Sequence, residues 1–169
     1  MLRKHGEHCV LLIPELGASV SVKERNKIAE LVDTSVAAGG AVKTGGKSPA
    51  GAGAFYPATV LSVKNDNPIL VQEIFGPVAP IVVTNSDEEA IELANATEFG
   101  LIAYVYSSDL KRAIKVAESL ESGMVAINKG VISDPAAPFG GFKQSGLGRE
   151  GGFAGIEEFL ETKYIGVEI

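Results

Sequence analysis

Helix-like and strand-like segments alternate along almost the whole chain, and this alternation limits the fold more than any other feature. The first helix signal is a serine three residues before a glutamate, Ser21 and Glu24, which is the spacing of a capping box. Apolar residues at helical spacing follow it, and Gly39-Gly40 marks the end. By the same signals, helices are expected over about residues 21–38, 86–96, 109–123 and 153–160. Strands are expected at 41–44, 55–63, 78–83, 101–106, 124–127 and 164–169.

Strands that alternate with helices predict an α/β domain with a largely parallel sheet and flanking helices. The apolar run at 78–83 suits a buried strand in such a sheet. In open sheets of this kind, ligands bind beyond the carboxyl ends of the strands. The strand at 124–127 delivers the chain to such a position, and a glycine-rich stretch follows it.

The glycine-rich stretch runs from Ala136 to Glu150 and has four glycines within nine positions, Gly140 to Gly148. Glycine permits positive φ angles and close approach of the backbone. A flexible linker would lack the Pro138, Phe139 and Phe142 found here. Two interpretations remain, a long structural turn and a loop that lines a pocket.

The composition excludes several classes of protein. The 169 residues suit one domain or one piece of a larger protein, and 46% of them are hydrophobic. No apolar run approaches the roughly 20 residues that span a bilayer, and no signal peptide is visible, so we expect a cytoplasmic protein without a membrane partner. The single cysteine agrees with a reducing compartment. A net charge of −6 without a basic cluster argues against nucleic acid as a partner.

Three blocks of sequence resemble the C-terminal half of the NAD(P)-dependent aldehyde dehydrogenase superfamily. They are Glu73-Ile74-Phe75-Gly76-Pro77, Asn95-Ala96-Thr97-Glu98-Phe99-Gly100-Leu101, and the stretch from Pro138 to Glu150. Their order and spacing match the superfamily, and the resemblance extends from about residue 20 to the end of the chain. Asn128 to Ser133, ahead of Pro138-Phe139-Gly140-Gly141, resembles the succinate-semialdehyde dehydrogenase branch.

The resemblance implies roles for four residues. Glu73 matches a glutamate that binds the nicotinamide ribose hydroxyls, and Phe75 matches an aromatic residue beside the nicotinamide ring. On the substrate side, Phe139 matches an aromatic that lines the aldehyde pocket, and Ser133 matches a serine that helps to hold the distal carboxylate. From the residues alone, Glu73 could equally be a solvated strand-edge residue and Ser133 an ordinary turn residue. Lys143 and Arg149 are expected to hold the loop through backbone and carboxylate contacts.

The catalytic groups of the superfamily do not match residues of this chain. The superfamily uses a cysteine nucleophile and a glutamate base. Cys9 is not expected to be that nucleophile, because it precedes Glu73 by only 73 − 9 = 64 positions and lacks the family's flanking sequence. Glu15 precedes Leu-Gly-Ala but follows Cys9, the reverse of the family order. No dinucleotide-binding fingerprint is present. His5, His8 and Cys9 lack a fourth ligand, so no metal site is expected.

The resulting hypothesis is a C-terminal fragment of an NAD(P)-dependent aldehyde dehydrogenase, inactive alone and without a bound cofactor of its own. The implied parent reaction oxidises succinate semialdehyde, or a similar aldehyde, to the carboxylic acid through a cysteine thiohemiacetal. Residues 1–19 remain poorly readable, residues 20–161 correspond to part of the catalytic domain, and residues 162–169 are expected to be a strand that forms a homo-oligomer. The alternative is a non-catalytic α/β remnant that acts only in subunit association. The sequence does not decide between NAD and NADP.

Overall fold

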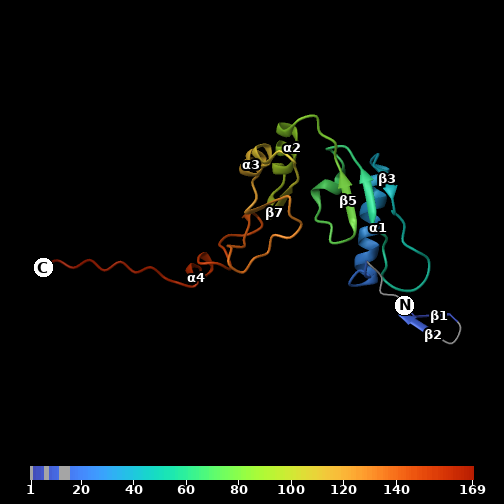
Figure 1. The fold of residues 1–169 in the computed structure, drawn as a ribbon, viewed down its shortest axis with the longest axis horizontal. Coiled ribbons are helices and arrows are strands. Elements are labelled where there is room, and N and C mark those ends of the chain that lie inside the picture. Colours follow the sequence, from blue (N-terminus) through green and yellow to red (C-terminus); the bar gives the residue numbers. More distant parts are fainter. Residues whose placement is uncertain (1, 6–7, 12–15) are drawn as a thin grey trace. The chain divides into compact units, whose positions relative to one another are not determined.

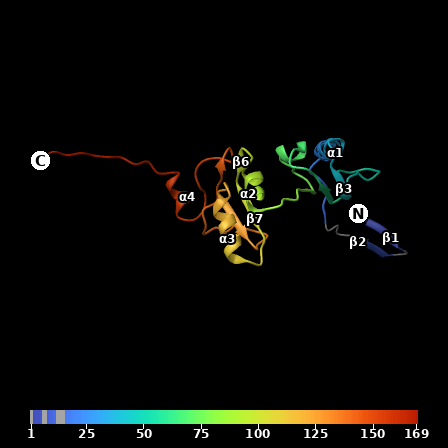
Figure 2. The same cartoon turned by 90° about the horizontal axis from the view of Figure 1, so that it is seen from above.

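The computed structural model describes residues 2–5, 8–11 and 16–169 of the chain (Figure 1). Contacts divide the chain into two compact units, Met1–Val83 and Thr84–Ile169. Figure 2 shows the same elements from above. Each unit has its own helices and its own small sheets, so each is described separately.

The first unit contains one long helix and a three-stranded sheet. The sheet has the order β3-β4-β5, with β3 antiparallel to β4 and β4 parallel to β5. A separate antiparallel pair, β1 and β2, precedes the helix. The elements are β1 (Leu2–His5), β2 (His8–Leu11), α1 (Val22–Ala37), β3 (Ala41–Thr44), β4 (Thr59–Ser62), the 3-10 helix η1 (Pro68–Val71) and β5 (Val78–Ile81).

Helix α1 begins where the capping signal predicts. The Ser21 hydroxyl accepts a hydrogen bond from the Glu24 amide at 3.1 Å, which satisfies one of the unpaired amides of the first turn. One face of the helix then packs into the core through Ile28 and Val32, which are 3% and 1% exposed. The other members of this core cluster are Tyr56, Leu61, Val63 and Ile69. Burial of these side chains stabilises the unit by roughly 1.5–3 kcal/mol for each large apolar group.

The second unit contains two helices that pack on a parallel pair of strands. Helix α3 contacts β7, β8 and α2. The pair β7–β8 is parallel, and the pair β6–β9 is antiparallel. The elements are α2 (Asp87–Asn95), β6 (Phe99–Gly100), β7 (Ile102–Val105), α3 (Leu110–Ser119), β8 (Met124–Ile127), β9 (Phe142–Lys143) and α4 (Ala154–Glu157).

An ion pair with two hydrogen bonds joins α2 to α3. The Arg112 guanidinium donates to both carboxylate oxygens of Asp87, at 2.7 and 2.5 Å. These hydrogen bonds hold the pKa of the Asp87 carboxyl below its usual value. Asp87 also lies in the first turn of α2, where a negative charge is favourable. The pair therefore fixes how the two helices pack against each other.

The α/β class is confirmed, but the expectation of one largely parallel sheet is wrong. Among the described residues the strands form separate sheets of two or three strands with mixed directions. The reason lies in the connections. Helix α3 connects β7 to β8 and η1 lies between β4 and β5, and both of these pairs are parallel. Residues 45–58 connect β3 to β4 without a helix, and that pair is antiparallel.

The structure also differs from the predicted buried strand at 78–83 and from the predicted strand at 164–169. Strand β5 is an edge strand with alternating exposure, and Ile81 is 48% exposed, so the prediction of a buried strand is wrong. Residues 158–169 form no helix or strand and continue as an extended, exposed segment (Figure 1). The expected oligomerisation strand at 162–169 thus stays a prediction. None of the helices in the described part of the chain is long and apolar enough to cross a membrane.

Replacing Tyr56 by Phe is expected to leave the free energy of unfolding unchanged or to raise it by about 1 kcal/mol. The buried Tyr56 hydroxyl has no hydrogen-bond partner among the residues that the structure describes, so its removal leaves no other group unpaired. Burial, with a smaller contribution from Asp33, raises the pKa of Tyr56. Because the folded protein holds the Tyr56 proton more tightly than the unfolded chain does, this stabilising contribution is fully present below the unfolded pKa of 10.0. The free energy of unfolding then falls as the pH rises above that value. Urea titrations followed by circular dichroism between pH 8 and pH 11 test this, and Tyr56→Phe should remove part of the alkaline loss. An identical alkaline loss in both proteins would contradict the assignment.

Candidate functional site

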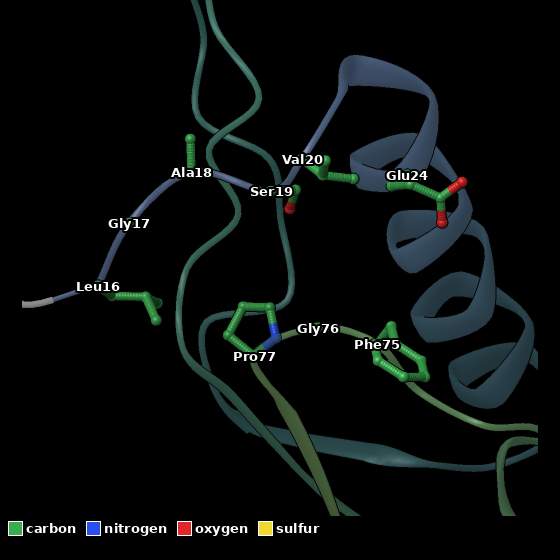
Figure 3. Close-up of a pocket in the computed structure, with 9 residues that line it drawn as sticks. All are labelled: Leu16, Gly17, Ala18, Ser19, Val20, Glu24, Phe75, Gly76 and Pro77. Carbon is green, nitrogen blue, oxygen red and sulfur yellow. The ribbon is translucent and has the colours of Figure 1, made fainter.

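A cavity of about 670 Å³ lies in the first unit, beside the first of the three sequence blocks (Figure 3). Its lining comes from the segment before α1, from the first turn of α1 and from the segment before β5. The lining residues are Leu16, Gly17, Ala18, Ser19, Val20, Glu24, Phe75, Gly76 and Pro77. Apolar side chains dominate, and Glu24 is the one charged residue among them. This arrangement suits a flat, largely apolar ligand with a polar edge.

Of the two residues that the resemblance places on the cofactor side, Phe75 and Glu73, only Phe75 lines this cavity. Phe75 lines the cavity and is 79% exposed, so its ring is available to a ligand. Glu73 is also exposed, but it is not among the residues that line this cavity. Glu24 is a lining residue that the sequence analysis did not assign to the site. In the sequence, the capping-box spacing of Glu24 indicates only the start of a helix. Its position near Phe75 follows from the tertiary structure.

The backbone of Gly76, next to Phe75, packs closely on the core of the first unit. A Cβ atom at this position would lie 2.8 Å from Cγ1 of Ile28 and would also collide with the end of that side chain. Ile28 is a buried residue of α1. A residue larger than glycine here would therefore have to displace the Ile28 side chain.

In the second unit, the structure brings the other two sequence blocks together. Strand β6, from the block at 95–101, pairs with β9 in the glycine-rich stretch, with Gly100 opposite Phe142. The Gly100 amide also donates to the Ser145 hydroxyl at 2.9 Å. Further along, Phe139 and Glu150 exchange two backbone hydrogen bonds of 2.7 and 2.8 Å, which close the loop. The stretch is therefore a fixed loop and not a flexible connection.

Lys143 anchors the loop to the end of α2. Its ammonium donates to the carbonyl oxygens of Asn95 and Thr97 at 2.7 and 2.9 Å. It also lies 2.5 Å from a carboxylate oxygen of Glu121. The residue has a φ of 54°, a conformation that costs energy for a residue other than glycine. The three charge-assisted contacts offset that cost.

Arg149 binds the same loop from its other end. Its guanidinium donates to the carbonyl oxygens of Gly141 and Gly148 at 3.0 and 2.6 Å. It also lies over the ring of Phe142, 5.5 Å from the centroid, where a cation is attracted to the aromatic face. Both residues therefore hold the loop through backbone carbonyl groups, as expected, and the expected carboxylate contact is the one that Lys143 makes with Glu121.

Phe139 lines two cavities of the second unit. The first, of about 470 Å³, lies against the glycine-rich loop. The second, of about 210 Å³, is lined by Met124, Val125, Ile132, Asp134, Ala137, Pro138 and Phe139. Ser133 is exposed and lines neither of them, whereas its neighbours Ile132 and Asp134 line the smaller one. Sequence reasoning singled out Ser133 and missed Asp134.

The other two candidate groups lie near the N-terminus of the chain. Cys9 lies in β2, opposite Lys4 in the backbone register, and Glu15 falls outside the described residues. No three His, Cys, Asp or Glu residues among those described are grouped as a metal site would require. The described residues do form cavities, one lined by Phe75 in the first unit and two lined by Phe139 in the second.

Comparison with known proteins shows the family and supports the α/β fold. The family model described as "Aldehyde dehydrogenase family" matches residues 13–165, so the chain belongs to the aldehyde dehydrogenase family. A succinate-semialdehyde dehydrogenase of Paenarthrobacter nicotinovorans is 52% identical over 154 residues, which are 90% of this chain and 34% of that protein. The mitochondrial succinate-semialdehyde dehydrogenase of Mus musculus is 47% identical over 150 residues, 88% of this chain and 29% of that protein.

Solved structures show the same likeness. The succinate-semialdehyde dehydrogenase from Burkholderia pseudomallei has a TM-score of 0.80 at 47% identity, over 85% of this chain and 30% of that one. The enzyme from Streptococcus pyogenes, solved with NADP+, has a TM-score of 0.83 at 36% identity, over 91% and 35%. The resemblance inferred from the three sequence blocks is thereby confirmed. The chain spans about a third of the length of the curated relatives that it matches.

Replacing Gly76 by Ala is expected to lower the free energy of unfolding by about 1–3 kcal/mol, because the added methyl group must displace Ile28. Gly17→Ala is the matched control, since Gly17 lines the same cavity and has open space around the added atom. Urea denaturation followed by circular dichroism measures both variants. Equal stability of the two variants would show that the close packing at Gly76 does not hold the segment.

Replacing Lys143 by Met should loosen the glycine-rich loop, because the side chain loses its contacts with two carbonyl oxygens and one carboxylate. We expect a local destabilisation of about 1–2 kcal/mol, seen as roughly tenfold faster exchange of the Gly100 amide hydrogen. Lys163→Met, in the exposed C-terminal segment, serves as the control. Exchange at Gly100 that is the same in both variants would argue against the anchor.

Proposed function

We propose that this chain supplies part of the site of an NAD(P)-dependent aldehyde dehydrogenase that oxidises succinate semialdehyde or a closely similar aldehyde to its acid. The observation that carries the proposal is the 52% identity to a succinate-semialdehyde dehydrogenase over 90% of the chain. The loop geometry supports it, because two of the three sequence blocks, residues 95–101 and 138–150, are joined by the β6–β9 pair. Residues of both blocks, Leu101 and Phe139 among them, line the same cavity.

On the cofactor side, the proposed residues are Phe75 and Glu73. A flat exposed ring beside a largely apolar cavity fits one face of a nicotinamide. The exposed Glu73 carboxylate suits two neighbouring ribose hydroxyls, since both of its oxygens accept hydrogen bonds. When bound, the nicotinamide cofactor supplies hydride acceptance. The residues described here bind and orient; neither of them acts on a proton of the substrate.

On the substrate side, Phe139 is proposed to form one wall of the aldehyde pocket and Ser133 to assist in holding a distal carboxylate. A hydroxyl is only an auxiliary anchor for an anion, because charged donors bind anions about twice as strongly. The contacts of Lys143 and Arg149 hold the loop in which Phe139 lies.

A chimaera tests this proposal. Residues 20–169 would replace the corresponding part of the Paenarthrobacter nicotinovorans enzyme, and turnover of succinate semialdehyde would be followed by NAD(P)H absorbance. We expect activity, a KM for the cofactor that rises about tenfold in Glu73→Gln, and a smaller rise in Phe75→Leu. A folded but inactive chimaera would contradict the proposal. The unmodified chain should show no turnover; activity that Cys9→Ser abolishes would overturn that expectation.

A second candidate is a non-catalytic role in subunit association. It is favoured by the exposed apolar residues of the C-terminal segment, such as Ile165 and Val167, which are 74% and 78% exposed. Light scattering of the full chain and of residues 1–161 tests it. We expect association of the full chain that is lost on truncation, and two monomers would rule it out.

A further inference from the structure

Two residues other than glycine have a left-handed backbone conformation in the described part of the chain, and they enclose the segment that contains Phe139. Asn128 has a φ of 53° and follows β8 directly, and Lys143 has a φ of 54° in β9. Such conformations cost energy, and they persist where surrounding contacts hold them in place. Lys143 is held by its bonds to the end of α2 and to Glu121. Asn128 is held by a different set of contacts.

The side chain of Asn128 bonds to both backbone groups of Ser107. Its Oδ1 atom accepts a hydrogen bond from the Ser107 amide at 2.9 Å, and its Nδ2 atom donates to the Ser107 carbonyl oxygen at 2.8 Å. The Asn128 amide donates to the carbonyl oxygen of Val105 at 2.8 Å, one step beyond the paired residues of β7 and β8. The side chain therefore continues the pairing of the two strands, while its own backbone turns away from them.

Asparagine suits this position for two reasons. Its amide side chain offers an acceptor and a donor side by side, as a backbone peptide group does. It also adopts positive φ more readily than most other residues. The bonds to Ser107 hold the turn, because without them the backbone at residue 128 would relax toward the more favourable negative φ.

The turn at Asn128 sets the direction of residues 129–134, which form the first part of the loop. Ile132 lines the cavity of about 210 Å³, together with two residues of β8 and with Phe139. Ser133, the proposed auxiliary anchor for a carboxylate, is the next residue of the loop. Asn128 itself lines neither cavity of the second unit. An effect of Asn128 on a bound molecule is therefore transmitted through the loop.

We propose that Asn128 is a positioning residue, whose bonds to Ser107 fix the course of residues 129–134 and so place Ile132 and Ser133 for an aldehyde that ends in a carboxylate. A displaced loop weakens the binding of the substrate and of the transition state alike, so the effect falls on KM and not on kcat. The inference rests on the proposed function, because it takes the cavity beside Phe139 to be an aldehyde pocket.

The test uses two variants of Asn128 and one control. Asn128→Gly still permits positive φ but removes both side-chain bonds, whereas Asn128→Asp keeps an acceptor for the Ser107 amide and loses only the donor. The control is Asn65→Gly, at an exposed position between β4 and η1 in the first unit. Nuclear magnetic resonance of the ¹⁵N-labelled full chain gives the exchange rate of the Ser107 amide hydrogen and the amide shifts of Ile132 and Ser133. The chimaera described above gives kcat and KM for succinate semialdehyde.

We expect Asn128→Gly to speed exchange of the Ser107 amide hydrogen about tenfold, because two hydrogen bonds are lost. The amide signals of Ile132 and Ser133 should move as well, although these residues lie four and five positions from the substitution. In the chimaera, KM should rise about fivefold while kcat stays within about twofold. Asn128→Asp should fall between Asn128→Gly and the unaltered protein in each measurement, and Asn65→Gly should match the unaltered protein.

Signals of Ile132 and Ser133 that stay in place in Asn128→Gly would overturn the inference, since the bonds would then hold Ser107 alone. An unchanged KM in an active chimaera, or a fall in kcat without a rise in KM, would overturn it too. If the chimaera with the unaltered sequence is inactive while the loop signals move as expected, the result counts against the proposed function alone. The loop signals are read in the full chain without turnover, so the two failures are distinguishable.

Discussion

The second unit depends on the ammonium group of Lys143. It bonds to two carbonyl oxygens at the end of α2 and to Glu121, which follows α3, so one side chain joins the glycine-rich loop to both helices. In this position Lys143 adopts a left-handed backbone conformation, which is energetically unfavourable for a residue other than glycine. Once β9 is anchored there, the backbone bonds between Phe139 and Glu150 and the guanidinium of Arg149 close the rest of the loop. The shape of the wall around Phe139 follows from these contacts.

In the first unit the segment before β5 is held by close packing instead of by hydrogen bonds from a charged side chain. Gly76 packs against the side chain of Ile28 in α1, and its sequence neighbour Phe75 lines a cavity. In each unit, contacts that hold a loop segment thus lie close in the sequence to an aromatic ring that lines a cavity.

The chain belongs to the aldehyde dehydrogenase family and spans about a third of the length of the relatives that it matches. Within the small cavity beside Phe139, Asp134 is a lining residue, whereas Ser133, the residue matched to carboxylate binding in the family branch, is not.

The sequence by itself determined the start of each main helix, the place of the central strands β3, β4, β5, β7 and β8, and the family. Those signals act over a few residues, as in the bond from the Glu24 amide to the Ser21 hydroxyl, or are carried by motifs whose spacing is fixed along the chain. Only the tertiary structure decided that the sheets are small and mixed in direction, that Lys143 reaches Asn95 from 48 positions away, and that Asp134 instead of Ser133 faces the cavity. These outcomes depend on which segments meet in space, and packing between distant segments leaves no periodic or local trace in the sequence.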